Sequence, residues 1–183
     1  MHALEVFWRQ GYAATTIDNL ASAMGLNKPS LYNAYGDKQT IYRQALAAFI
    51  AQVEQEVSAA LASSSDIRAA VKRFFDGALA LYCAESPALG CFAICTATAE
   101  AVAHQDIQQD LAGIIAGLDA MLTARYTQAL AAGQLGPQPT PADRARLTQA
   151  VLHSLAVRSR AGESRASLTR LAEQAVALLC PAL

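Results

Sequence analysis

The chain has 183 residues, of which 54% are hydrophobic, and its formal net charge is only −1. This length allows one large domain or two smaller ones with a buried core, and the many alanines favour an all-helical protein because alanine is the best helix former. No apolar run reaches the roughly 18 residues that span a bilayer, so we expect a cytoplasmic protein with no membrane partner. The four cysteines lack the spacing of a disulfide framework or a zinc site, so we expect reduced thiols and no bound metal.

Two short helices are predicted in the first part of the chain. Apolar residues at helical spacing precede Gly11, which suits a first helix that ends at this glycine. A second helix is predicted from near Thr16 to just before Gly25. Thr15 and Asp18 have the spacing of a capping box, with aspartate in the position that glutamate or glutamine usually occupies.

Two more helices are predicted next, one very short and one long. Asn27 can act as an N-cap, and Pro29 falls in the first turn of the third helix, where a missing N–H group costs nothing. This helix is expected to end at Gly36. Asp37 can then cap a long fourth helix over residues 38–62.

Five further helices are predicted after residue 62. Loops are expected at the serines of residues 63–65, at residues 85–90, and at residues 131–143, which contain two glycines and three prolines. The predicted helices span residues 66–82, 91–102, 105–132, 141–161 and 164–180. Strand-like alternation of useful length is absent, so the predicted fold class is all-α with about nine helices.

Residues 15–35 have the outline of a helix-turn-helix, whose second helix enters the major groove of DNA. Leu31 would pack this short helix against the preceding two and leave its polar side chains free for DNA. The stretch FWRQGYAATTIDNLASAMGLNKPSLYNAYGDKQTIYRQAL, residues 7–46, resembles the TetR family of bacterial transcriptional regulators. The resemblance implies a helix-turn-helix DNA-binding domain over residues 1–45 and a helical effector-binding and dimerisation domain over residues 46–183.

The resemblance also implies DNA-contact roles that side-chain chemistry permits. Lysine can contact guanine or phosphate, asparagine and serine can bond base edges, and hydroxyls near a helix N-terminus can hold phosphates. The base-reading candidates are Lys28, Pro29, Ser30 and Asn33, the phosphate-binding candidates are Thr16, Tyr32, Tyr35 and Lys38, and Thr15 and Asn27 complete the predicted DNA-binding set. The alternative is that the tyrosines are core aromatics, the threonines are only caps and the lysine of residue 38 is a solvated charge.

The second domain is expected to hold a small-molecule effector between its helices, in a mainly apolar cavity. The candidate lining residues are Phe74, Tyr82, Cys91, Cys95, Thr98, Met121 and Tyr126. For each of them, a role in the core or on the surface is the alternative. Cys91 would begin a helix, where a thiol has a lowered pKa, so a response to oxidants or electrophiles through Cys91 is an alternative to ligand sensing.

We therefore predict a homodimeric transcriptional regulator that binds double-stranded operator DNA and needs no cofactor. By resemblance, the last two helices form the dimer interface, and the operator is palindromic because a two-fold dimer presents two recognition helices. The expected regulator is a repressor that a small molecule releases from DNA. An enzyme is the competing class, but His2, His104 and His153 are scattered and no catalytic or metal-binding spacing accompanies them. A helical interaction module without DNA binding is the third alternative.

Overall fold

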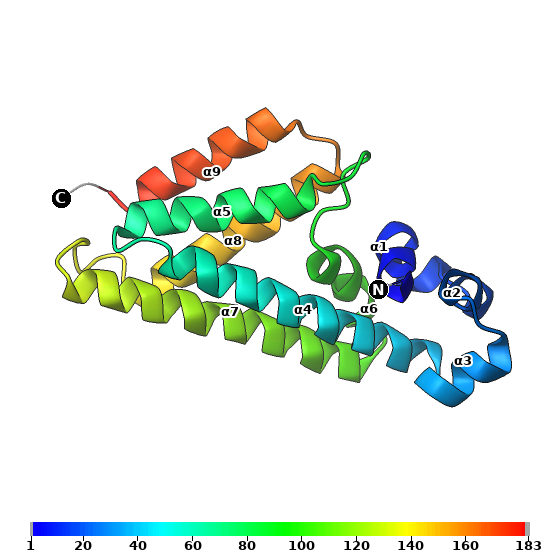
Figure 1. Ribbon diagram of the computed structural model, residues 1–183. Coiled ribbons are helices and arrows are strands. Elements are labelled where there is room, and N and C mark those ends of the chain that lie inside the picture. The colour runs from blue at the N-terminus through cyan, green and yellow to red at the C-terminus, as the bar shows by residue number, and fades with distance from the viewer. Residues whose placement is uncertain (1, 182–183) are drawn as a thin grey trace. The chain divides into compact units, whose positions relative to one another are not determined.

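The computed structural model describes residues 2–181, and every regular element in this part of the chain is helical (Figure 1). The elements in chain order are α1 (His2–Ala14), α2 (Ile17–Met24), α3 (Lys28–Tyr35), α4 (Lys38–Ala62), α5 (Ile67–Tyr82), the π-helix η1 (Ala93–Ala97), α6 (Thr98–Glu100), α7 (Gln105–Ala131), α8 (Pro141–Arg160) and α9 (Arg165–Leu179). The all-α prediction is confirmed. Across residues 2–181, no helix is both long and apolar enough to cross a membrane.

The chain divides into two compact units. The first contains the residues up to Gln52 together with Phe92–Ala112, and the second contains Val53–Cys91 and the chain from Gly113 onward. Helices α4 and α7 therefore contribute residues to both units. This division describes packing within one chain, and the functional boundary between residues 45 and 46 stays a prediction.

The cap of α2 differs from its prediction by one residue. Thr16 is the N-cap: its hydroxyl accepts a hydrogen bond from the backbone N–H of Asn19 at 3.1 Å, and the Asn19 side chain accepts one from the Thr16 N–H at 3.0 Å. The predicted box of Thr15 and Asp18 is wrong. Gly11 breaks α1 with a φ of 78°, and the Thr15 hydroxyl donates to the Gly11 carbonyl at 2.6 Å, which turns this side chain inward.

The caps of the next two helices follow their predictions. Asn27 accepts a hydrogen bond from the Ser30 N–H at 2.9 Å, and Pro29 lies in the first turn of α3. Asp37 accepts one from the Thr40 N–H at 2.8 Å at the start of α4. Between α2 and α3, Gly25 adopts a left-handed conformation with a φ of 66°, which glycine reaches without steric cost.

An aromatic cluster forms the core of the first unit. The ring centroid of Tyr42 lies 5.2 Å from that of Phe7, 5.1 Å from that of Tyr12 and 5.6 Å from that of Phe92. Phe92 also packs on Phe49, with centroids 5.6 Å apart. Helices α1 and α4 are thus joined to the segment that begins at Phe92.

The predicted helix over residues 91–102 is wrong in type. Its first turns are the π-helix η1, and the α-helical part, α6, has only 3 residues. The Thr96 hydroxyl donates to the Phe92 carbonyl at 2.7 Å and also bonds the Tyr42 hydroxyl at 2.7 Å. A side-chain hydroxyl that bonds the backbone in this way competes with the regular helical ladder, which is a signal that apolar periodicity does not contain.

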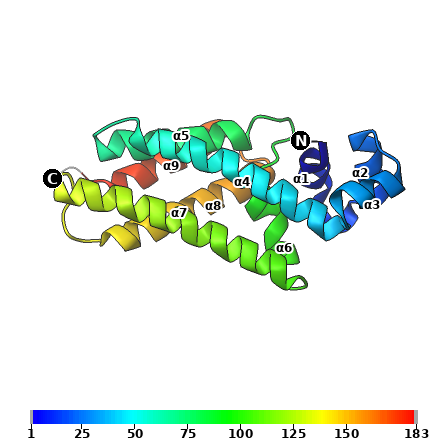
Figure 2. The same ribbon diagram turned by 60° about the horizontal axis from the view of Figure 1, so that its bottom comes forward.

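The second unit is a helical bundle built on α5, α8 and α9, which pack on one another (Figures 1 and 2). Its core includes Phe75 and Leu155, both with 0% exposure. The predicted linker after α7 folds against Arg144, which is only 1% exposed and donates to the carbonyls of Pro139 and Gln138, each at 2.9 Å. Arg144 also donates to the Leu179 carbonyl at the end of α9.

Leu31 has 0% exposure and is the buried residue of α3. Leu31→Ala should lower the free energy of unfolding by about 2 to 5 kcal/mol, because it leaves a cavity where α3 is anchored. Asn33→Ala, at an exposed position of the same helix, should change it by less than about 0.5 kcal/mol. Urea denaturation followed by circular dichroism measures both, and equal midpoints would contradict the anchoring role of Leu31.

Burial raises the pKa of Tyr42 to about 12. The unfolded chain loses this proton near pH 10, whereas the folded chain retains it, so the contribution of Tyr42 to stability is present below about pH 10 and is lost as the pH rises towards 12. Tyr42→Phe should therefore show a smaller loss of stability between about pH 9 and 11 than the wild type. Urea denaturation at both pH values tests this, with Tyr32→Phe as the control at an exposed tyrosine. An unchanged slope in Tyr42→Phe would refute the assignment.

Candidate nucleic-acid interface

Helix α3 presents one buried anchor and a polar outer surface. Leu31 faces the unit's interior, while Lys28, Pro29, Ser30 and Asn33 are all exposed. The helix follows α2 after a turn at Gly25, so α2 and α3 form the helix-turn-helix that the spacing predicts (Figure 1). Asn33 and its exposed neighbours therefore lie on the surface of a helix that could enter a groove.

The two tyrosines of α3 are not core residues. Tyr32 is 49% exposed and Tyr35 is 38% exposed, which is unusual for such large side chains. Their exposure removes the alternative that they form the interior of the three-helix unit. A phenol ring on the surface with an accessible hydroxyl can donate a hydrogen bond to a phosphate oxygen.

Thr16 and Thr15 have opposite environments. Thr16 is exposed at the N-terminus of α2, where first-turn N–H groups can donate hydrogen bonds to an anion. Thr15 is only 1% exposed, and both its N–H and its hydroxyl bond to the chain, to Tyr12 and Gly11 respectively. A side chain that is buried and already hydrogen-bonded cannot reach DNA. We therefore no longer count Thr15 among the candidate DNA-binding residues.

Lys28 forms an ion pair with Asp18 across the helix-turn-helix. The distance between Lys28 Nζ and the Asp18 carboxylate is 2.9 Å, and both side chains are more than half exposed, at 54% and 72%. The hydrogen bond to this carboxylate raises the pKa of Lys28. Exposed pairs of this kind contribute little to stability, so Lys28 can exchange Asp18 for a phosphate or a base edge.

Lys38 is half-buried at the start of α4, and its side chain contacts α1. Its Nζ lies 4.3 Å from the centroid of the Tyr12 ring and 3.4 Å from the Ala13 carbonyl oxygen. The cation–π contact holds the ammonium group near the junction of α1 and α4. The ammonium group of Lys38 is therefore held in place by contacts with α1. The alternative that Lys38 is only a solvated surface charge does not describe this environment.

Residues 92–112 also belong to the first unit, and the spacing of apolar residues in the sequence did not predict this. The His104 ring lies 5.3 Å from the Tyr12 ring, and Arg43 of α4 bonds Asp110 of α7 twice, at 2.6 and 2.9 Å. A distance of 67 residues separates Arg43 from Asp110 in the chain. Local periodicity carries no signal for such a contact, and only a record of coupled changes between the two positions could have indicated it.

The predicted effector residues are divided between the two units. Phe74, Tyr82 and Tyr126 are buried in the second unit, while Cys95 and Thr98 belong to the first, with Thr98 exposed. Tyr126 is 1% exposed and its hydroxyl bonds that of Thr148 at 2.8 Å, as expected of a satisfied core tyrosine.

Met121 and Cys91 are the two remaining candidates, and both are half-buried in the second unit. Met121 lines a pocket, whereas Cys91 directly precedes the helical turn that leads into η1. Sensing through this thiol stays a prediction. Within residues 2–181, no group of three or more His, Cys, Asp and Glu side chains is placed to hold a metal ion.

Comparison with known proteins identifies the helix-turn-helix. Residues 2–45 match the family model described as bacterial regulatory proteins of the tetR family. The repressor ComR of Escherichia coli (strain K12) is 24% identical over 171 residues, 93% of this chain and 81% of that protein. The activator FasR of Mycolicibacterium smegmatis is 36% identical over 78 residues, which are 40% of this chain and 36% of that protein.

Solved structures share the whole fold. The TetR family regulator CifR, as a cysteine mutant complexed with 26-bp double-strand operator DNA, superposes with a TM-score of 0.84 at 25% identity, over 96% of this chain and 92% of that one. A TetR regulator from Chloroflexus aurantiacus has a TM-score of 0.88 at 18% identity, over 99% of this chain and 91% of that one, a likeness of fold alone. The matched family model and the helix-turn-helix show that residues 2–45 form a DNA-binding domain of the tetR type, and the chain has the fold of TetR family transcriptional regulators.

Proposed function

We propose that the protein is a repressor that binds a palindromic operator as a homodimer and leaves it when a small molecule binds. The supporting relative is ComR, a repressor that aligns over 93% of this chain, whereas the alignment with the activator FasR covers 40%. CifR, the TetR family regulator with a TM-score of 0.84, is held on double-stranded operator DNA in its structure. A protein with this task works in the cytoplasm, where bacterial DNA lies.

The observation that supports operator recognition is the exposure of Lys28, Ser30 and Asn33 on α3, a helix that the buried Leu31 anchors. We assign base reading to Lys28, Ser30 and Asn33, with Pro29 as an apolar contact. The phosphate contacts are assigned to Thr16, Tyr32, Tyr35 and Lys38, and Asn27 contributes by capping α3. The DNA-binding domain in this proposal spans residues 1–45, and the effector-binding and dimerisation domain spans residues 46–183.

The proposed dimer interface lies on the outer faces of α8 and α9. On α8, Leu147 and Val157 are 51% and 56% exposed, and with Ala150 and Ser154 they follow the three-and-four spacing of one helical stripe. On α9, Leu178 is 79% exposed. Large apolar side chains that face water on two packed helices are typical of an interface between subunits.

Release by an effector requires that the ligand bind one conformation of the dimer more tightly than the other. Helix α4 supports this part of the proposal because it begins next to the recognition helix and contributes residues to both units. A ligand that shifts the second half of α4 therefore acts on the same helix that holds Lys38.

Asn33→Ala should weaken binding to the operator by about 1 to 3 kcal/mol and relax its sequence preference, because it removes a base contact. Lys38→Ala should weaken binding to operator and random DNA alike, because it removes a phosphate contact. Fluorescence anisotropy with duplexes from the protein's own promoter and with random duplexes measures both effects. Gln55→Ala on α4 is the control and should bind as the wild type does. Loss of preference in Lys38→Ala with no change in Asn33→Ala would reverse the assignments.

Val157→Asp should convert the dimer to a monomer, because it places a charge in the apolar stripe of α8. Sedimentation velocity measures the mass of the particle, and operator binding should weaken in parallel because one recognition helix is lost from each complex. Thr127→Asp, which adds the same charge at an exposed site on α7, should remain dimeric. A dimeric Val157→Asp protein would rule out this interface.

A further inference from the structure

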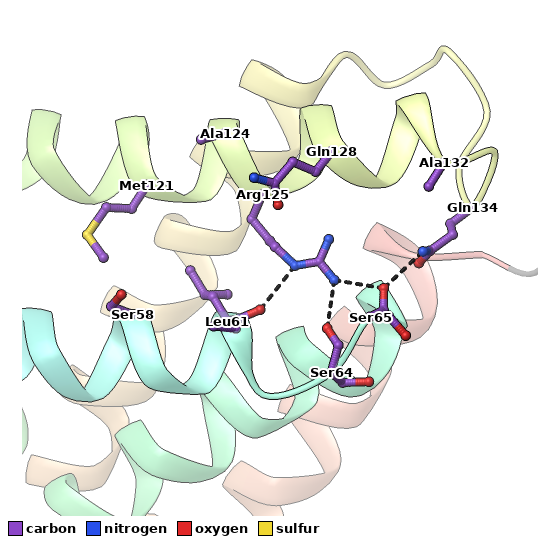
Figure 3. A pocket seen from close by; sticks show the side chains of 11 residues that line it. Ser58, Leu61, Ser64, Ser65, Met121, Ala124, Arg125, Gln128, Ala132 and Gln134 are labelled. Atoms are coloured by element: carbon purple, nitrogen blue, oxygen red, sulfur yellow. Dashed lines mark hydrogen bonds between the residues drawn. The ribbon is translucent and has the colours of Figure 1, made fainter.

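A pocket of about 610 Å³ opens in the second unit, beside the last turns of α4 and the second half of α7 (Figure 3). Its volume lies within the range of small-molecule sites, roughly 300 to 1,000 Å³. Of the effector candidates that the sequence suggested, Met121 is the one that lines it. The pocket is therefore a different site from the buried core around Tyr126.

The lining of the pocket combines apolar and polar side chains. Met121 lies on one side of the view, Gln134 lies on the opposite side, and Arg125 lies between them (Figure 3). Leu61 and Ala124 add apolar surface, and aspartate and glutamate are absent from the lining residues. A ligand that fits this lining has an apolar body and a polar head that is not cationic.

Arg125 carries a positive charge that no carboxylate neutralises. Its Nε donates to the Leu61 carbonyl at 3.1 Å, and its Nη2 donates to the carbonyls of Ser64 and Ser65 at 3.1 and 3.0 Å. Within residues 2–181 Arg125 has no ion pair, and its Nη1 has no acceptor. Figure 3 shows this third nitrogen without a bond to the residues drawn. Two N–H donors of a fixed, half-buried guanidinium are thus left for a ligand.

Gln128 supplies a second donor on the same face of α7. It follows Arg125 by three residues, a spacing that places both side chains on one side of a helix. Gln128 is exposed and lines the pocket, and its amide has no hydrogen-bond partner in the described part of the chain. The amide N–H group and the free edge of the guanidinium therefore offer donors to one head group.

We propose that this pocket binds a small organic carboxylate with an apolar body. The carboxylate accepts hydrogen bonds from Arg125 Nη1 and from the Gln128 amide, and the apolar body lies against Met121, Ala124 and Leu61. A guanidinium already held by three carbonyl groups is pre-organised for this contact, so little side-chain entropy is lost on binding. Binding as such is independent of the proposed function, whereas a role of this ligand as the effector rests on it.

Isothermal titration calorimetry of the full chain without DNA tests the site with three probes, each up to about 10 mM, a range that includes very weak ligands. Hexanoate is the expected ligand. Hexanamide, which has the same body without the charge, should bind at least about tenfold more weakly, as the loss of a charged hydrogen bond predicts. Acetate, which has the charge without the body, should also bind at least about tenfold more weakly. Absence of hexanoate binding, or equal affinity for either comparison probe, would overturn the proposal.

Two variants keep the test informative even though Arg125 also holds the loop after α4. Arg125→Lys keeps the charge but loses the fork of donors, and should weaken hexanoate binding by about tenfold or more. Ser58→Trp fills the pocket from α4 while Arg125 and its three carbonyl partners remain, and should abolish binding. Ala59→Trp, on the same turn but outside the lining, is the matched control and should bind as the wild type does. Unchanged binding by Ser58→Trp would place hexanoate elsewhere and overturn the site.

A DNA titration separates this proposal from the proposed function. If hexanoate binds and lowers operator affinity, with neither effect in Ser58→Trp, the pocket is an effector site. If hexanoate binds through the pocket and operator affinity is unchanged, the carboxylate site is supported and its role as the effector site fails.

Discussion

Burial of the Tyr42 ring is the constraint on which the first unit depends. The ring packs on Phe7, Tyr12 and Phe92, and its hydroxyl has a bonding partner in Thr96, so neither its apolar nor its polar part is left unsatisfied. Aromatic side chains bury large areas and prefer edge-on contacts, which fix the angles between the elements that carry them. The helix-turn-helix is short and could not hold its shape alone. It takes its stability from this core through α1 and α4.

The same core explains why a segment far along the chain belongs to the DNA-binding unit. Phe92 enters the aromatic cluster, and Arg43 binds Asp110 through two hydrogen bonds at 2.6 and 2.9 Å. The start of α7 is thereby tied to the start of α4. Because both helices continue into the second unit, each is a covalent route by which a change at one end of the helix can reach the other. A segment with π-helical hydrogen bonding, η1, lies at this connection, and such segments occur often where function requires irregular geometry.

Two arginines of the second unit, Arg144 and Arg125, both donate hydrogen bonds to backbone carbonyl groups but have different roles. Arg144 is 1% exposed and donates to carbonyl groups of the loop that precedes α8 and of the α9 terminus, so its charge is enclosed by acceptors. Arg125 also bonds carbonyl groups, in the last turn of α4 and in the loop after it, but it faces an open pocket and its Nη1 has no acceptor in the described part of the chain. Enclosure makes the first residue structural. Access from solvent makes the second a candidate for binding, although both positions read in the sequence as ordinary helical arginines.

The sequence by itself determined most of the helices, the caps of α3 and α4 and the resemblance of the helix-turn-helix to the TetR family, because these depend on residues close together in the chain. Asn27, Pro29 and Asp37 act within three or four residues of their partners, so their roles were predictable. Tertiary structure alone decided which hydroxyl faces water at Thr15 and Thr16, where Phe92 packs, and which side chains share a cavity. The division of the predicted effector residues between the two units was not predictable for the same reason. Apolar spacing shows that a residue is buried, but the neighbours it is buried against depend on contacts between segments that lie far apart in the chain.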